Sequence, residues 1–156
     1  MNSYHHVLGG DILDTGTHFV VGIGLAGLST IDPSVAGDSH TFTAVLIGTI
    51  AASQAPDLDT LYRLKSNADY IRNHRGWSHS LPAIGIWSLA ISGILNVIFP
   101  SASFTTLLFW VLTAVIIHVF SDLFNTYGTQ AARPFSEKWI GWNIIHIFDP
   151  WIFSAH

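Results

Sequence analysis

The sequence predicts an all-α fold, a multi-helix membrane protein with about four transmembrane or membrane-embedded helices. Hydrophobic residues make up 49% of the 156-residue chain and charged residues only 10%, whereas a soluble domain has roughly 25% charged residues. Mean hydropathy is +0.43. Residues 76–121 contain no Asp, Glu, Lys or Arg, and a stretch of that length suits two bilayer crossings of about 20 residues each.

The N-terminal region divides before residue 14. Residues 1–6 are polar and residues 8–10, Leu-Gly-Gly, are flexible, and we interpret residues 1–13 as a dispensable leader. The remainder, 14–156, is expected to be a single membrane-embedded domain. The first helix is expected over Phe19–Ile31, with Asp14 or Thr15 as its N-cap.

The second helix is expected over Phe42–Ser53, because turn signals at Asp32-Pro33 and Gly37-Asp38 separate two apolar segments. Both segments are shorter than the roughly 20 residues of a full crossing, so we expect them to tilt or to extend through flanking polar residues. Small residues recur in both segments, which either lets membrane helices approach closely or reflects ordinary apolar sequence. They are Gly22, Gly24, Ala26, Gly27, Ala44, Gly48, Ala51 and Ala52.

The third and fourth helices are expected over Leu81–Phe99 and Phe104–Phe120, on either side of a turn at Pro100–Ser103. The chain then continues as a polar and aromatic structured loop over Asn125–Ser136. It ends with a Trp-rich amphipathic stretch over Trp139–Phe153.

All six cations lie in two segments, and their distribution predicts the orientation of the helices. Four precede the third helix and two follow the fourth, whereas the loops over 32–41 and 100–103 have none. By the positive-inside rule, the segments with Lys and Arg face the cytoplasm. We therefore expect two helical hairpins in the cell membrane, with both chain ends inside.

The composition also restricts the ligands. The net charge is −4 without a basic run, so the electrostatic surface of a nucleic-acid-binding protein is missing and no nucleic acid is expected as a partner. The chain has no cysteine, which excludes thiolate metal sites and disulfides. Any bound metal would be held by imidazole and carboxylate groups, and the nine histidines make such a site feasible.

Seven histidines and aspartates lie at the ends of the apolar stretches, and the expected topology places all of them on the cytoplasmic side. Burying such groups beside a membrane core is costly unless they pair or hold an ion. Imidazole and carboxylate suit zinc first, with manganese or iron as alternatives. We predict that the set binds one or two divalent ions. Its members are His18, Asp57, Asp59, His74, His79, His118 and Asp122.

Two of these pairs have a structural alternative. His118 and Asp122 are four residues apart and share one face of a helix, where they would bind one ion, bridge two, or form a hydrogen bond that caps the helix. Asp57 and Asp59 would point to the same side of an extended segment. Taken alone, this second pair is more typical of a turn or an N-cap.

The segment over 73–80 has the highest density of candidate site residues. Gly76 permits a tight bend that would turn His74 and His79 inward. Arg75 would stabilise an anionic oxygen, such as that of a phosphate in a transition state.

Two serines of this segment and one arginine of the later loop are candidates for supporting roles. Ser78 or Ser80 would donate a hydrogen bond or cap the helix that follows. Arg133 in the later loop is a candidate second contact for an anion.

This ligand set favours metal-dependent hydrolysis of an ester or phosphoester by a metal-activated water. Arg75, Asp59 and His79 are the candidate catalytic residues. The partners expected are the lipid bilayer and a lipid-like or phosphoester substrate that enters laterally. The alternative is a non-catalytic membrane protein with a closed, structural or sensing metal site. A transporter is disfavoured, because the third and fourth helices hold few polar groups at mid-membrane depth.

At these motifs the sequence resembles the small integral-membrane, metal-dependent hydrolases related to LexA-regulated inner-membrane proteins (DUF457-like). The resemblance covers most of residues 14–150 and implies hydrolase activity. More distantly, the ligand pattern is similar to that of zinc-dependent phospholipase C and P1-type nucleases. Members of the family often continue further, so the end at His156 suggests C-terminal truncation. The matching motifs are Thr17-His18, Pro56-Asp57-Leu58-Asp59, His74-Arg75-Gly76-Trp77-Ser78-His79-Ser80, His118 with Asp122, Asn125–Thr129 and Pro134–Ser136.

Overall fold

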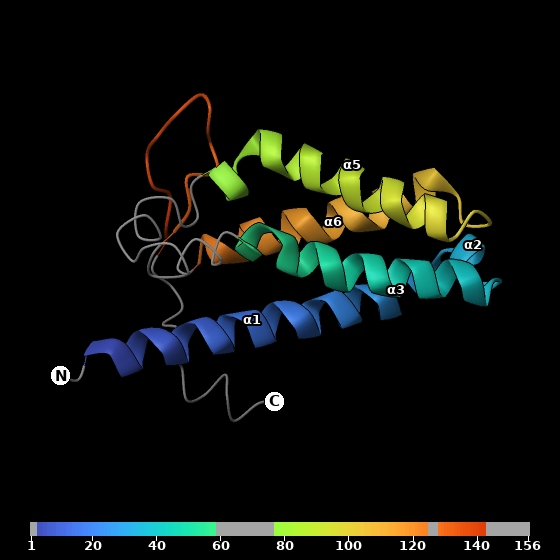
Figure 1. Ribbon diagram of the computed structural model, residues 1–156, viewed down its shortest axis with the longest axis horizontal. Coiled ribbons are helices and arrows are strands. Elements are labelled where there is room, and N and C mark those ends of the chain that lie inside the picture. The colour runs from blue at the N-terminus through green and yellow to red at the C-terminus, as the bar shows by residue number, and fades with distance from the viewer. Residues whose placement is uncertain (1–2, 59–76, 125–127, 143–156) are drawn as a thin grey trace.

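Four long helices form a bundle in which consecutive long helices run in opposite directions (Figure 1). A computed structural model describes residues 3–58, 77–124 and 128–142, with side chains from residue 15 onward. These residues contain one isolated bridge, Thr129 with Ile140, and no strand, so the all-α prediction is confirmed. The long helices are α1 (Ser3–Leu28), α3 (Ser39–Gln54), α5 (Leu81–Ile98) and α6 (Phe104–Asp122).

The boundaries of α5 and α6 agree with the sequence prediction to within two residues, but α1 begins much earlier. It starts at Ser3 rather than Phe19, so Asp14 and Thr15 lie inside the helix and neither is its N-cap. An existing helix gains a hydrogen bond with each added residue and has no new nucleation cost, and this part of the chain contains no proline to stop it. That residues 1–13 are dispensable stays a prediction.

The predicted turn between the first two apolar segments contains helix caps. Asp32 caps α2 (Pro33–Ala36), which follows a 3₁₀ turn at Ser29–Ile31, and its carboxylate accepts a bond from the amide two residues on at 2.9 Å. Asp38 caps α3 by accepting bonds from two backbone amides at 3.1 and 3.0 Å. Aspartate satisfies amides that have no partner within the helix, so each of the two aspartates starts the helix that follows it.

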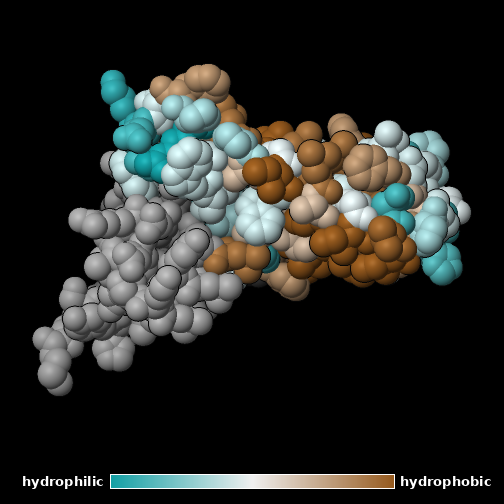
Figure 2. All heavy atoms as spheres, turned by 45° about the horizontal axis from the view of Figure 1, so that its top comes forward, coloured by the Kyte–Doolittle hydropathy of each residue, from teal (hydrophilic) through white to brown (hydrophobic). Residues whose placement is uncertain are grey.

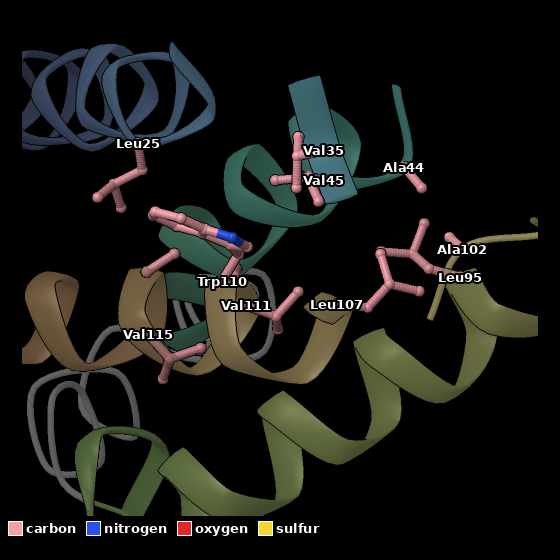
Figure 3. Packing of buried hydrophobic residues seen from close by; sticks show 12 residues of the cluster. Leu25, Val35, Ala44, Val45, Leu95, Ala102, Leu107, Trp110, Val111 and Val115 are labelled. Atoms are coloured by element: carbon pink, nitrogen blue, oxygen red, sulfur yellow. The ribbon is translucent and has the colours of Figure 1, made fainter. Parts of the chain in front are cut away.

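The hydrophobic core lies around the central helices α3 and α6, which contact each other and separate α1 from α5 (Figures 1 and 3). Val45 of α3 and Leu107 and Val111 of α6 are fully buried, with Trp110 beside them. α5 contributes few buried side chains, and two of the three are serines. Most of the apolar surface of α5 therefore faces outward.

Large apolar side chains remain exposed along the outside of the bundle. Val97 and Ile86 on α5 are 80% and 66% exposed, and Phe109 on α6 is 60% exposed. Figure 2 shows this apolar surface along the helices, with hydrophilic residues gathered at both ends of the visible face. Among the described helices, α5 and α6 are long and apolar enough to cross a membrane. Soluble monomers rarely expose such a surface, and lipid is the solvent that matches it.

Small residues bring α1 close to α3. Gly22 is buried against α3, and a Cβ atom there would lie 2.9 Å from Ile50 Cα and 3.0 Å from the Thr49 carbonyl oxygen. Gly24 and Gly27, by contrast, are exposed and have nothing within 4 Å of such an atom. Close helix approach therefore explains part of the small-residue pattern, namely the residues on one helical face.

Replacing Gly22 by Ala is expected to destabilise the bundle by about 1–3 kcal/mol, the usual cost of an overpacked interior. The new methyl group would meet backbone atoms of α3, which cannot rotate away as a side chain can. Thermal or denaturant unfolding in detergent would measure the change. Gly24→Ala is the matched control, because it adds the same methyl group in open space. Equal stability of the two variants would contradict this account of the α1–α3 contact.

Candidate metal centre

Four potential metal-ligand atoms converge at the end of the bundle where α3 and α6 finish and α5 begins. Asp57 lies in a 3₁₀ turn after α3, His79 closes a 3₁₀ turn before α5, and His118 and Asp122 lie on the last part of α6. The four atoms are all within 4.8 Å of one another. Three of the side chains are fully buried, and that of Asp57 is 15% exposed. The site is thus closed except on the side of Asp57.

Five of the six distances between these atoms are close to the edges of a tetrahedral metal site, and the sixth, between Asp57 and Asp122, is at most 4.8 Å. His79 Nε2 lies 3.2 Å from His118 Nε2, and the two nitrogens lie 3.0 and 3.5 Å from Asp122 Oδ2. Asp57 Oδ1 lies 3.5 and 3.6 Å from the same two nitrogens. For metal–ligand distances of about 2.0–2.2 Å, the edges of a tetrahedron are about 3.3–3.6 Å long. The side chains therefore surround a volume of the size that a zinc-like ion requires.

A backbone carbonyl fixes the orientation of the His118 ring. His118 Nδ1 lies 2.7 Å from the carbonyl oxygen of Ser53, which can only accept a hydrogen bond, so Nδ1 carries the proton. In the neutral ring Nε2 then has its lone pair directed at the cluster, the tautomer that a metal requires. The carbonyl is available because it lies near the C-terminus of α3, where helical partners are missing.

Two serines hold the segment that carries His79. Ser78 Oγ lies 2.8 Å from His79 Nδ1, so it contacts the ring nitrogen that faces away from the cluster. Ser80 caps α5, because its Oγ accepts a bond from the Ala83 amide at 3.4 Å and donates one to the Trp77 carbonyl at 2.7 Å. The prediction that a serine of this segment caps the next helix is confirmed for Ser80.

His18 lies beside the four-atom cluster on the opposite side of Asp122. Its Nε2 is 3.3 Å from Asp122 Oδ1, and its ring is stacked at a tilt on His118 with a centroid distance of 3.9 Å. The two oxygens of Asp122 thus face different histidines. With one ion bound, His18 would orient the carboxylate from outside, whereas with two ions the carboxylate would bridge them.

The buried charges shift the pKa values of two groups outside the membrane helices. Burial opposes ionisation of Asp57, but the His118 and His79 imidazoles outweigh it and hold the pKa of the carboxyl well below its usual range. Burial also disfavours the charged form of His79, but Asp122 and Asp57 outweigh it and raise its pKa to about 9. Without an ion, a proton on His79 balances part of the carboxylate charge.

The donor set fits a divalent cation. Two imidazole nitrogens and two carboxylate oxygens are ligands that zinc, manganese and iron accept. Asp57 Oδ1 is buried and has no hydrogen-bond partner among the described residues. Its contacts with the two histidine nitrogens, at 3.5 and 3.6 Å, are too long for good hydrogen bonds. An ion in the cluster would satisfy this oxygen, which supports a metal over a network of hydrogen bonds alone.

The structure brings together four of the seven predicted ligands and places His18 next to them. Of the two arrangements considered for Asp57, the structure shows the turn and not the extended segment, because residues 55–58 form a 3₁₀ turn. Asp59, His74 and Arg75 lie outside the described residues, so their roles stay predictions. The Ser53 carbonyl was not predicted, since a backbone group has no signal in the sequence.

Comparison with known proteins agrees with the membrane character of the chain. Protein YfhP of Bacillus subtilis (strain 168), itself uncharacterised, is 55% identical over 144 residues, which are 92% of this chain and 44% of that protein. The chain thus spans less than half the length of this relative. No solved structure matches the chain. Residues 13–156 match the sequence pattern of an inner membrane family, and the chain belongs to that family, the YdjM inner membrane proteins.

Proposed function

We propose that this protein is a multi-pass, membrane-bound, metal-dependent hydrolase of ester or phosphoester bonds. The observation that carries the proposal is the convergence of four His and Asp ligand atoms within 4.8 Å in a buried site. The membrane family and the exposed apolar helices support an enzyme that works at the bilayer. A lipid-like substrate is the class most easily delivered there, because it reaches the end of the bundle by lateral diffusion.

The chain's own residues divide the chemical work between them. When bound, a divalent ion, zinc most directly, supplies Lewis acidity and makes a water molecule more acidic. His118 and Asp122 are held rigidly on α6, and the Ser53 carbonyl keeps one His118 nitrogen directed at the ion. Asp57 is the part-exposed ligand, so water and substrate would approach from its side. Arg75 and Asp59 are proposed to stabilise anionic charge and to assist proton transfer.

The orientation that we propose places the site on the cytoplasmic side. The segment between α3 and α5 holds four of the six cations, and the segment after α6 holds the other two. Both segments join the bundle at the end where the site lies (Figure 1). The positive-inside rule therefore supports a cytoplasmic site.

A closed site with a structural or sensing role is the second candidate. Four protein ligands would complete the coordination of a four-coordinate ion, which is typical of structural zinc. A catalytic site requires one coordination position of the ion to open for water. The partial exposure of Asp57 favours opening at that ligand. Hydrolysis of an ester by the metal-loaded protein would distinguish the catalytic role from the structural or sensing role.

Hydrolysis of generic phosphomonoesters, phosphodiesters and carboxylic esters by the zinc-loaded protein in detergent tests the proposal. We expect Asp57→Asn to lower the rate at least about 100-fold, because losing several kcal/mol of charge stabilisation has that effect. His40→Ala is the control, since His40 is an exposed histidine at the start of α3. Unchanged turnover in Asp57→Asn would place the assayed activity elsewhere. Bound metal without turnover of any ester would favour the structural role.

A further inference from the structure

Arg133 lies against the short segment that carries His79. Its guanidinium carbon is 5.1 Å from the centroid of the Trp77 ring, and Trp77 is two residues before His79 in the same 3₁₀ turn. The backbone joins the same two segments, because the Leu81 amide donates to the Ala131 carbonyl at 3.2 Å. The loop over 128–142 and the start of α5 are therefore fixed to each other at two points (Figure 1).

The loop that presents Arg133 is braced internally. Thr129 and Ile140 exchange two backbone hydrogen bonds of 2.9 Å, and the Gln130 side chain donates to the Glu137 carbonyl at 2.8 Å. Gly128 has φ of +65° at the point where the loop opens, a conformation that other residues rarely adopt. Such bracing holds the guanidinium in place before any ligand arrives, which lowers the entropy lost on binding.

The guanidinium of Arg133 has unused hydrogen-bonding capacity. Its Nε atom is buried and has no hydrogen-bond partner among the described residues. Among the described residues, the guanidinium pairs with the carboxylate of Glu137, which lies 3.8 Å from Nη2 and belongs to a side chain that is 84% exposed. A solvated pair at that distance is weak. Because this pair is weak, the terminal guanidinium nitrogens are available to an external anion.

We infer that Arg133, stacked on Trp77, forms an oxyanion subsite for a phosphate group beside the segment that carries His79. The planar fork of the guanidinium matches two oxygens of a phosphate, and the Trp77 ring holds it from one face. Exposed Phe135 and Trp139 lie on the same loop, which suits the level of lipid headgroups. This subsite deepens the proposed function, and it rests on that function only for the step from phosphate binding to substrate positioning.

Binding of inorganic phosphate to the full chain in detergent tests the subsite without any turnover. We expect calorimetry of the zinc-loaded protein to show at least about tenfold weaker phosphate binding in Arg133→Gln, since a charge-assisted bidentate contact is lost. Arg133→Lys should also bind more weakly, because it keeps the charge but not the fork. Lys138→Gln is the matched control, an exposed cation five residues along the same loop, and should change the affinity less than about twofold.

Phosphate binding in nanodiscs with and without phosphatidic acid would show whether the phosphate group belongs to a lipid headgroup or to a soluble phosphate ester. In nanodiscs of phosphatidylcholine containing phosphatidic acid, a lipid headgroup in the subsite would reduce binding of inorganic phosphate to the wild type and not to Arg133→Gln. Equal phosphate binding in discs with and without phosphatidic acid would assign the subsite to soluble phosphate esters. Both outcomes keep the subsite, and they differ in the source of its ligand.

Other outcomes would overturn the inference. Unchanged phosphate affinity in Arg133→Gln would do so, as would equal losses in Arg133→Gln and Lys138→Gln. If Arg133→Gln does not fold, wild-type affinity in Arg133→Lys would have the same consequence. Arg133-dependent phosphate binding without ester turnover would contradict the hydrolase function and leave the subsite. Turnover that depends on Asp57 but not on Arg133 would contradict the subsite and leave the function.

Discussion

Asp122→Asn is expected to abolish stoichiometric metal binding. Among the described residues, Asp122 contacts all three buried histidines, with Oδ2 at 3.0 and 3.5 Å from His79 and His118 and Oδ1 at 3.3 Å from His18. The amide keeps the shape but removes the negative charge and replaces one acceptor with a donor. Loss of an outer-shell partner already weakens metal sites about 10–100-fold, so loss of this central ligand should weaken binding further. Elemental analysis of protein purified without chelators would measure it.

The same measurement on His18→Ala distinguishes one ion from two. With one ion, His18 orients Asp122 from outside, so the metal content should stay the same while affinity falls about 10–100-fold. With two ions, the metal content per chain should fall by one. His40→Ala, which removes an exposed histidine from the other end of α3, should change neither value. Full metal content in Asp122→Asn would show that the ion is held elsewhere.

Metal affinity should rise about tenfold for each pH unit between roughly pH 6.5 and pH 9, because one proton must leave for each ion bound. In the metal-free protein His79 has a pKa raised to about 9, so it is protonated at neutral pH and must lose that proton to become a ligand. Asp57 has a lowered pKa and contributes no proton over this range. Zinc titrations at several pH values would give the slope. A flat profile would mean that His79 is neutral before the ion arrives.

The stability of the metal-free protein should show the opposite trend. A histidine whose folded-state pKa lies above its unfolded value of 6.5 contributes stability below pH 6.5 that is lost as the pH rises to about 9. The metal-free protein should therefore unfold more easily at pH 9 than at pH 6.5, while the zinc-loaded protein gains from tighter binding. Unfolding curves with and without zinc at the two pH values would check both signs.

Local sequence pattern predicted the helices well where local forces decide them. The charge-free stretch over 76–121 gave α5 and α6 nearly at their observed ends, because length and hydropathy alone select a membrane helix. Local pattern failed at α1, where composition changes near residue 14 but the helix does not stop. A leader without proline can continue a helix, so composition did not mark the boundary.

The spacing of His118 and Asp122 placed both on one face of α6, and the structure confirms that both face the cluster. That inference needed only the helical period. Asp57 lies in a 3₁₀ turn, which is one of the two arrangements that the sequence left open, and not in an extended segment. Its membership in the cluster could be predicted from residue type, whereas the sequence did not decide between a turn and an extended segment.

By itself, the sequence determined that this is a helical membrane protein whose histidines and aspartates gather at the ends of apolar segments, because hydropathy and residue type are local properties. Only the tertiary structure decided which atoms meet. The contact of Gly22 with α3, the Ser53 carbonyl behind His118 and the division of Asp122 between His18 and the other histidines all join residues far apart in the chain. Such contacts depend on how closely and at what rotation the helices approach, which the hydrophobic pattern of each helix leaves open.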